Sequence, residues 1–148
     1  MDETYSYEYE STLDPQLLAT FLLIWSAVAI IGIVAYWKIF TKAGRSGVAS
    51  LIPIYNLYVL AKIVGKRGWY LLWFLVPIAN LVVAIKLIHY LSKSFGKDVG
   101  FTLGLLFLPI IFYPILAFGD SKYIGPFADR EAFAAYQQQD QFDFETAR

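Results

Sequence analysis

The strongest constraint on the fold is a long apolar run near the N-terminus. The 24 residues Leu17–Phe40 contain one charged side chain, Lys38. As a helix they extend about 36 Å, enough to cross a hydrocarbon core roughly 30 Å thick. The flank before the run is acidic, and the run exceeds the about 7–15 apolar residues of a signal-peptide core. We therefore predict a membrane-spanning helix rather than a cleaved signal.

Three further apolar stretches follow, separated by short basic turns. Hydrophobic residues make up 58% of the 148 positions and charged residues 16%, unlike a soluble domain. We predict an all-α polytopic membrane bundle with about four transmembrane segments and proline-kinked helices. An alternative has three spans and one re-entrant segment, 48–64. The predicted parts are an acidic tail 1–16, a membrane domain 17–118 with segments 17–40, 48–64, 69–92 and 100–118, and a polar tail 119–148.

One motif occurs twice in the membrane domain, as an internal repeat. Leu-Ile-Pro-Ile-Tyr-Asn-Leu contains Pro53 and Asn56, and Leu-Val-Pro-Ile-Ala-Asn-Leu contains Pro77 and Asn80, 24 residues later. Proline removes a backbone donor, and an amide in hydrocarbon requires a hydrogen-bond partner. We expect kinked helices whose asparagines bond to neighbouring helices. The alternative is a polar midplane site at broken helices, as in transporters.

The distribution of charge predicts the orientation. Residues 1–16 carry five acids and no base, whereas Lys38, Lys42 and Arg45 end or follow the first span. Because basic loops remain in the cytoplasm, the N-terminus is expected outside. Four crossings would put the pair Lys66 and Arg67 outside as well, against this rule. A second segment that enters and returns would keep the pair inside, but it would move Lys93 and Lys97 outside.

Two other pairs are candidate sites within the membrane domain. Lys86 and His89 lie one helical turn apart, and an ionisable group in a membrane is a functional candidate. Lys86 stands near a basic loop, however, so its stem can extend to the interface. Gly100 and Gly104 have the four-residue spacing that permits close helix packing. We expect packing within the fold rather than dimerisation.

Catalytic, metal and cofactor sites are not predicted. The chain has no cysteine and one histidine, and it has no acid between Gln16 and Lys97. Paired carboxylates, phosphate-binding loops and a Ser/His/Asp set are therefore missing from the membrane core, and a His-based metal site is not expected. We expect no enzyme activity and no nucleic-acid partner. In the C-terminal tail, residues 128–139 are predicted to form an amphipathic helix.

Several short motifs, in a fixed order, connect the chain to a known family. They are YWKIFTKAGRSGVASLIPIYNLYVLAKIVGKRGWY, LVPIANLVVAIKLI, SKSFGKDVGF and LGLLFLPIIFYPILAFGDSKY. Over Trp37 to about Pro126 the chain resembles an uncharacterised bacterial family of small polytopic membrane proteins with repeated Ile-Pro-x-x-Asn elements. Members are sometimes labelled signal peptidase-like. The only methionine here is Met1, so the Ser-Met nucleophile motif of signal peptidases is absent and the activity is not implied.

The sequence thus predicts a structural or accessory integral membrane protein that acts as a component of a bacterial membrane assembly. Its expected partners are the lipid bilayer and either another membrane protein or further copies of itself. The resemblance implies a bacterial cytoplasmic membrane. The apolar stretches predict a multi-pass chain, and the distribution of charge predicts an extracytoplasmic N-terminus. The alternative function is a small oligomeric transporter or channel with a polar site at the Pro/Asn breaks.

Overall fold

The fold is all-helical. A computed structural model describes residues 14–147, and these residues form six α-helices and two 3-10 helices with no strand. The predicted acidic tail lies outside the described residues except for its last positions. In chain order the elements are α1 (Pro15–Lys42), the 3-10 helix η1 (Gly47–Leu51), α2 (Pro53–Ile63), the 3-10 helix η2 (Gly68–Leu75), α3 (Pro77–Ser94), α4 (Val99–Phe107), α5 (Pro109–Phe118) and α6 (Arg130–Thr146).

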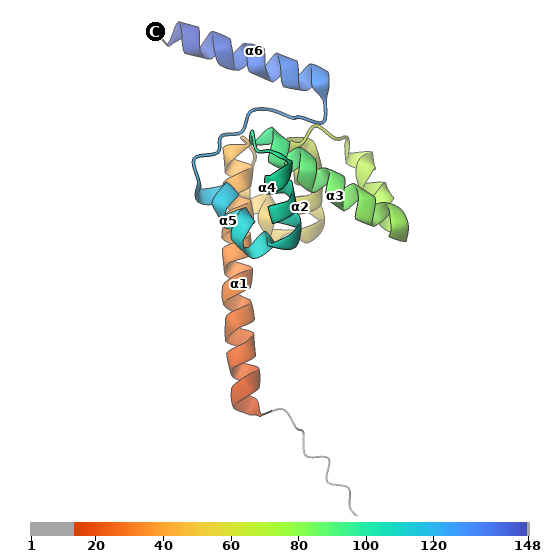
Figure 1. Ribbon diagram of the computed structural model, residues 1–148, viewed down its shortest axis with the longest axis vertical. Helices are drawn as coiled ribbons and strands as arrows, with labels where there is room; N and C mark the ends of the chain where they lie inside the picture. The colour runs from red at the N-terminus through yellow and green to blue at the C-terminus, as the bar shows by residue number, and fades with distance from the viewer. Residues whose placement is uncertain (1–13, 148) are drawn as a thin grey trace, which may run out of the picture.

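Helix α1 is about 42 Å long, at 1.5 Å per residue. Asp14 is its N-cap and accepts a hydrogen bond from the backbone N–H of Gln16 at 2.9 Å. The C-terminal half packs in the bundle and buries Ala35, Ile39 and Phe40. The N-terminal half projects away from all other helices (Figure 1). Within residues 14–147, α1 is the one helix long and apolar enough to cross a membrane.

The rest of the bundle consists of three helical pairs, which we call the proline hairpins: η1 with α2, η2 with α3, and α4 with α5. The two members of each pair pack against each other. Each pair turns at one residue followed by a proline: Ile52, Val76 and Leu108. Proline restricts the residue before it to extended conformations and is well accommodated as the first residue of a helix. All three prolines begin a helix, and Ile52 and Val76 are extended, whereas Leu108 has φ −129° and ψ 54°.

These turns correct the expectation of proline kinks at Pro53 and Pro77. Each proline is the first residue of a new helix and does not interrupt a continuous one. Ile52 (φ −109°, ψ 109°) and Val76 (φ −94°, ψ 116°) are extended, so the chain leaves the helical conformation before the proline. In the hairpins it is Pro114 that lies inside a helix, α5. The predicted segments 48–64, 69–92 and 100–118 are accordingly each divided into two shorter helices.

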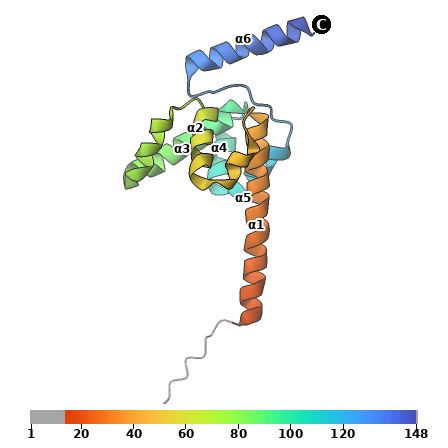
Figure 2. The same cartoon turned by 180° about the vertical axis from the view of Figure 1, so that it is seen from behind.

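The core lies where the hairpins meet the C-terminal half of α1. Helix α5 packs along α1, and α2, α3 and α4 complete the cluster. Its largest fully buried apolar side chains come from five helices: Ile39, Phe40, Ile63, Leu87, Leu91, Leu105 and Leu116. Helix α6, in the region where 128–139 was predicted to be helical, lies across the end of the bundle opposite the free half of α1 (Figure 2).

Candidate functional site

Three helices end in the same way on one side of the bundle. After α1, α2 and α3 the chain continues with Gly44-Arg45, Gly65-Lys66 and Gly96-Lys97. Each glycine has a positive φ, between 69° and 89°, which L side chains rarely adopt. Each basic residue donates its backbone N–H to a carbonyl of the last helical turn, at 2.7–3.0 Å. These are Schellman-type ends, and they place a cation directly beyond each helix C-terminus.

Lys42 joins the ends of α1 and α5. Its Nζ donates hydrogen bonds to the backbone carbonyls of Leu116 at 2.9 Å, Gly119 at 2.7 Å and Ser121 at 3.2 Å. The last carbonyls of a helix have no partner within it, and a cation there also interacts favourably with the helix dipole. Lys42 therefore fixes the C-terminus of α5 beside that of α1, with both helices running in the same direction.

The linker between α5 and α6, residues 119–129, runs across the C-terminal ends of α2 and α3. The Ile124 N–H donates to the carbonyl of Ser94 and the Ala128 N–H to that of Val64, both at 2.8 Å. The Tyr123 hydroxyl donates to the carbonyl of Ile63 at 2.5 Å. Burial raises the pKa of Tyr123 to about 12, and nearby Tyr136 adds to the shift. Four helix C-termini are thus gathered at one end of the bundle.

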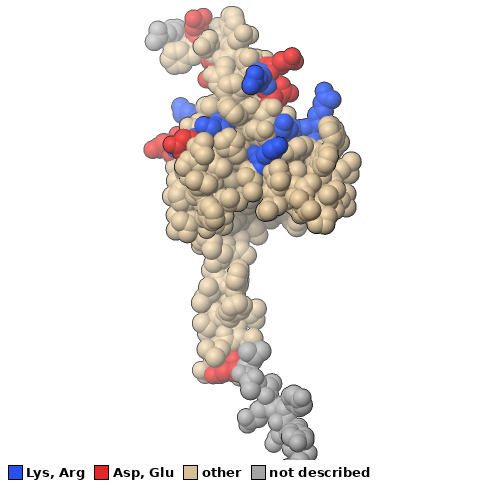
Figure 3. Space-filling view, turned by 45° about the vertical axis from the view of Figure 1, so that its right-hand side comes forward, with Lys and Arg blue, Asp and Glu red and all other residues tan. Residues whose placement is uncertain are grey.

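This end carries a basic surface, which we call the basic face. Figure 3 shows Lys and Arg side chains gathered at this level, below α6, with acids beside them and on α6. The visible surface of the lower bundle and of the free half of α1 has no basic side chain in this view. The basic face comprises the residues that end the helices or lie in the turns and linker: Lys42, Arg45, Lys62, Lys66, Arg67, Lys93, Lys97 and Lys122.

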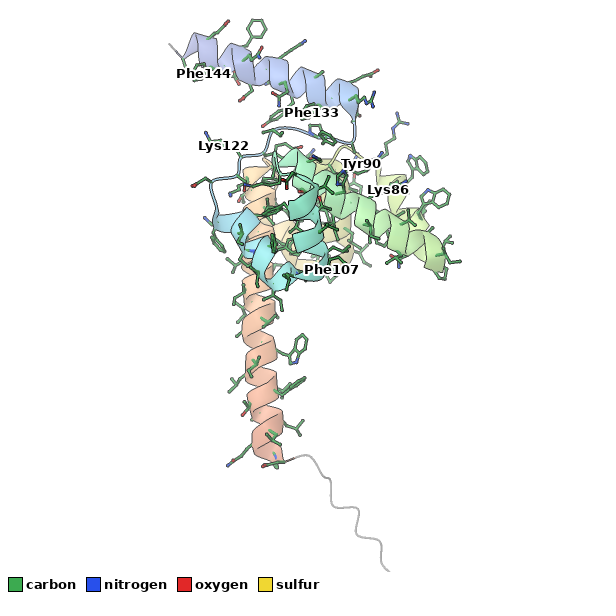
Figure 4. The ribbon with its side chains drawn as sticks, viewed as in Figure 1. Lys86, Tyr90, Phe107, Lys122, Phe133 and Phe144 are labelled. Carbon is green, nitrogen blue, oxygen red and sulfur yellow. The ribbon has the colours of Figure 1, made fainter. Side chains whose placement is uncertain are left out.

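The hairpin tips form the opposite end and are apolar. Ile54 is 82% exposed, Ile78 85% and Phe107 74%. Figure 4 shows Phe107 at the end of the bundle away from Lys122. Large exposed apolar patches in monomers mark membrane or protein contacts. The bundle is therefore polarised, with charge where the helices end and aliphatic and aromatic side chains where the hairpins turn.

Asn56 and Asn80 lie next to these tips, one turn after Pro53 and Pro77. Both are half-buried, and their backbone N–H groups bond to the carbonyls of Ile52 at 2.7 Å and Val76 at 2.8 Å. Sequence predicted that their side-chain amides bond within the bundle. Within residues 14–147 the structure gives neither amide such a hydrogen bond, because the first turns of α2 and α3 stand at the periphery rather than between packed helices.

Lys86 and His89 have different surroundings. Lys86 is exposed on α3, beside an apolar groove of about 500 Å³ that η2 and α3 form, and Figure 4 shows it on the same side of the bundle as Tyr90. His89 is half-buried, and its Nδ1 lies 3.3 Å from the Thr102 hydroxyl of α4. The histidine thus contributes to the α3–α4 contact, and the two side chains do not form a joint site.

Gly100 and Gly104 also differ. A Cβ at Gly104 would collide with the ring of Phe112 in α5, whereas one at Gly100 would only touch Asp98 Oδ1 at 3.5 Å. Gly104 thus allows α4 and α5 to pack closely inside one hairpin, and Gly100 makes no comparable contact. Regarding metal chemistry, the described residues contain no group of three or more His, Asp or Glu side chains that could hold an ion.

A groove lies between the turn after α1 and the outer side of α2. It has a volume of about 490 Å³ and is lined by Gly44, Arg45, Ser46, Ala49, Tyr55, Tyr58, Val59 and Lys62. No sequence pattern marks this set, because three of its residues lie in the basic turn after the first apolar segment and the others are spread over the predicted segment 48–64. The Gly-Arg or Gly-Lys pair that follows each of three helices is the sequence feature from which the helix ends near this groove could have been predicted.

Comparison with known protein families gives a match. No curated protein and no solved structure matches the chain. The model of a family of unknown function (DUF5684) matches residues 48–126, which cover the three proline hairpins and most of the linker. The match extends over more than half of the 148 residues. The chain therefore belongs to this family of unknown function.

Proposed function

We propose that the chain is a structural or accessory subunit of a membrane assembly, anchored by α1 and inserted into one leaflet through its proline hairpins. In this arrangement α1 is the one full span. The hairpins enter from the side of the basic face and return to it. The proposal replaces four crossings with one crossing and three re-entrant elements, and it extends the sequence-based alternative from one segment to three.

Helix length supports the single span. Helices α2 and α5, with 11 and 10 residues, extend about 15–17 Å. This is about half of a hydrocarbon core of roughly 30 Å, so the hairpins of α2 and α5 end near the midplane. Helix α3 is longer, with 18 residues, but it is not apolar enough over that length to be a candidate span. The 28 residues of α1 extend about 42 Å, which is more than the thickness of the whole hydrocarbon core. The projecting half of α1 then crosses the other leaflet alone, in accord with its exposed apolar surface.

Charge supports the same arrangement. The turns after α1, α2 and α3 all belong to the basic face, so Lys66 and Arg67 no longer conflict with Lys93 and Lys97. Every basic loop is then cytoplasmic, as the positive-inside rule requires. The acidic N-terminal flank is extracytoplasmic. The resemblance to a bacterial family makes the cytoplasmic membrane of a bacterium the expected location.

The observation that carries the assembly role is the pair of asparagines near the hairpin tips. Asn56 and Asn80 present half-exposed amides beside the most exposed apolar side chains, Ile54 and Ile78. Lipid chains cannot bond an amide, and an unsatisfied polar group there costs several kcal/mol. A neighbouring polypeptide with polar groups at the same depth removes this cost. We therefore propose that the first two tips contact a protein partner or a second copy.

The transporter alternative needs a polar cavity that reaches both asparagines. The grooves beside α2 and α3 have volumes of about 490 and 500 Å³, and neither is lined by Asn56 or Asn80. The groove beside α3 is lined mainly by apolar and aromatic side chains. These observations favour an assembly component over a conduit.

Photo-crosslinking in native membranes tests the proposal. A benzophenone amino acid replaces Ile54 or Ile78, with Leu22 on the free half of α1 as the matched control, because all three are strongly exposed apolar positions. We expect the two tip positions to give a protein adduct of discrete mass and Leu22 to give lipid adducts. Lipid adducts alone at both tips would refute the assembly role.

A further inference from the structure

The groove lined by Arg45 and Lys62 combines charge with aromatic surface. Tyr55, Tyr58 and Lys62 occur at successive turns on one side of α2, and Arg45 faces them from the turn after α1. The Tyr55 and Tyr58 rings are stacked, with centroids 6.0 Å apart and planes at 17°. Lys62 Nζ lies 5.6 Å from the centroid of the Tyr58 ring. The Tyr58 ring thus makes a cation–π contact with the ammonium group.

The polarity of this surface changes along α2 in one direction. Ile54 at the tip is followed by the two tyrosines, and Lys62 lies in the last turn. The exposed side chains of Leu51 and Ile52 extend the apolar part beside the lower end of the groove. A phospholipid has the same order of properties, with acyl chains at depth, a glycerol ester region above them and a charged head group at the surface.

We propose that this groove binds an anionic glycerophospholipid, with the head-group phosphate between the Arg45 guanidinium and the Lys62 ammonium. Guanidinium groups bind phosphate oxygens in a bidentate manner, while lysine binds them as a point charge. The phenol hydroxyls of Tyr55 and Tyr58 are available to the ester oxygens. The acyl chains lie against Leu51 and Ile54. This inference rests on the membrane insertion proposed above.

The lining of the groove favours an anion over a cation, because the described residues that form it include two bases and no acid. It favours a lipid over free phosphate because the apolar surface continues from the groove to the hairpin tip. Basic pockets on the cytoplasmic side of membrane proteins are known sites for anionic head groups. Binding here would also fix the turn after α1 to the outer side of α2.

The test uses the full chain in detergent, titrated with phosphatidylglycerol, phosphatidylcholine or inorganic phosphate, and bound lipid is counted by native mass spectrometry. The variants are Arg45→Gln and Lys62→Gln, with Lys122→Gln as the control of equal charge change outside the groove. We expect each groove variant to weaken phosphatidylglycerol binding roughly tenfold, the loss of one charge-assisted hydrogen bond. Lys122→Gln should bind as the wild type does.

Each other outcome overturns the inference. Equal weakening by all three variants would indicate a diffuse charge effect, and unchanged binding in both groove variants would exclude the site. Binding of inorganic phosphate as tight as that of phosphatidylglycerol would assign the groove to a free anion. A failure of the membrane insertion itself can be told apart from a failure of lipid binding in the groove. A chain that does not insert would fail to incorporate into nanodiscs of phosphatidylcholine alone. Arg45→Lys should restore part of the binding, which separates charge from folding.

Discussion

Replacing Lys42 with methionine tests whether its contacts hold the hairpins against α1. Lys42 Nζ bonds the carbonyls of Leu116, Gly119 and Ser121 at 2.7–3.2 Å. Methionine retains much of the apolar stem and removes the ammonium group. The carbonyl of Leu116 keeps a second donor, the Ser121 hydroxyl at 3.2 Å, so two of the three acceptors lose a partner that no described side chain replaces.

The expected loss of stability follows from the number of hydrogen bonds that are removed. A hydrogen bond to a charged group contributes about 1.5–3 kcal/mol when it is shielded from water, and less when water can replace it. The bond to Gly119 is exposed, while those to Leu116 and Ser121 are partly buried. We therefore expect Lys42→Met to lower the free energy of unfolding by about 2 kcal/mol in total.

The assay is reversible unfolding of the purified protein in mixed micelles, followed by tryptophan fluorescence. Lys38→Met is the matched control, since Lys38 is exposed one turn earlier on the same helix, and surface changes of this kind usually alter stability by less than about 0.5 kcal/mol. If the two variants unfold alike, the Lys42 contacts do not stabilise the bundle and the reasoning is refuted.

Two further changes test packing and the linker. Gly104→Ala should destabilise the protein by about 1–3 kcal/mol because the new methyl group meets the Phe112 ring. Gly100→Ala, the control, should be neutral or slightly stabilising. Similar unfolding of both variants would contradict the close α4–α5 contact. Tyr123→Phe should lose about 1 kcal/mol, since its hydroxyl donates to the Ile63 carbonyl. Because the pKa of Tyr123 is raised, its contribution to stability is complete below about pH 10 and is lost as pH rises through about 12. A stability difference between wild type and Tyr123→Phe that persists unchanged above pH 12 would contradict the role of the Tyr123 hydroxyl.

The sequence predicted the helical class and the position of the long apolar helix because these depend on local composition. Residues 17–40 lie within α1, Pro15–Lys42. The two positions added at each end reflect the Asp14 cap and the Lys42 contacts with α5. The latter cannot be read from the first segment alone, because its partners lie more than 70 residues away.

The hairpins were harder to predict for a physical reason. Pro53 and Pro77 fit both a kink inside a helix and the first position of a new helix, since in both cases the missing N–H is tolerated. The conformation of Ile52 and Val76 decides between them, and it depends on η1 and η2 packing back against α2 and α3. The sequence did contain one signal for hairpins. Lys66 and Arg67 conflict with four crossings, and this conflict favours a chain that returns to the same end of the bundle after each hairpin.

The central claim is that every turn of the basic face lies on one side of the membrane, and thiol accessibility tests it most directly. The chain has no cysteine, so Ser46→Cys, Arg67→Cys and Lys97→Cys each introduce a single thiol. The account predicts that all three resist an impermeant reagent on intact cells and react in inverted membrane vesicles. Reaction of Arg67→Cys on intact cells, with Ser46→Cys protected, would restore four crossings and contradict the account. Reaction of Lys97→Cys alone would instead establish three spans with one re-entrant segment.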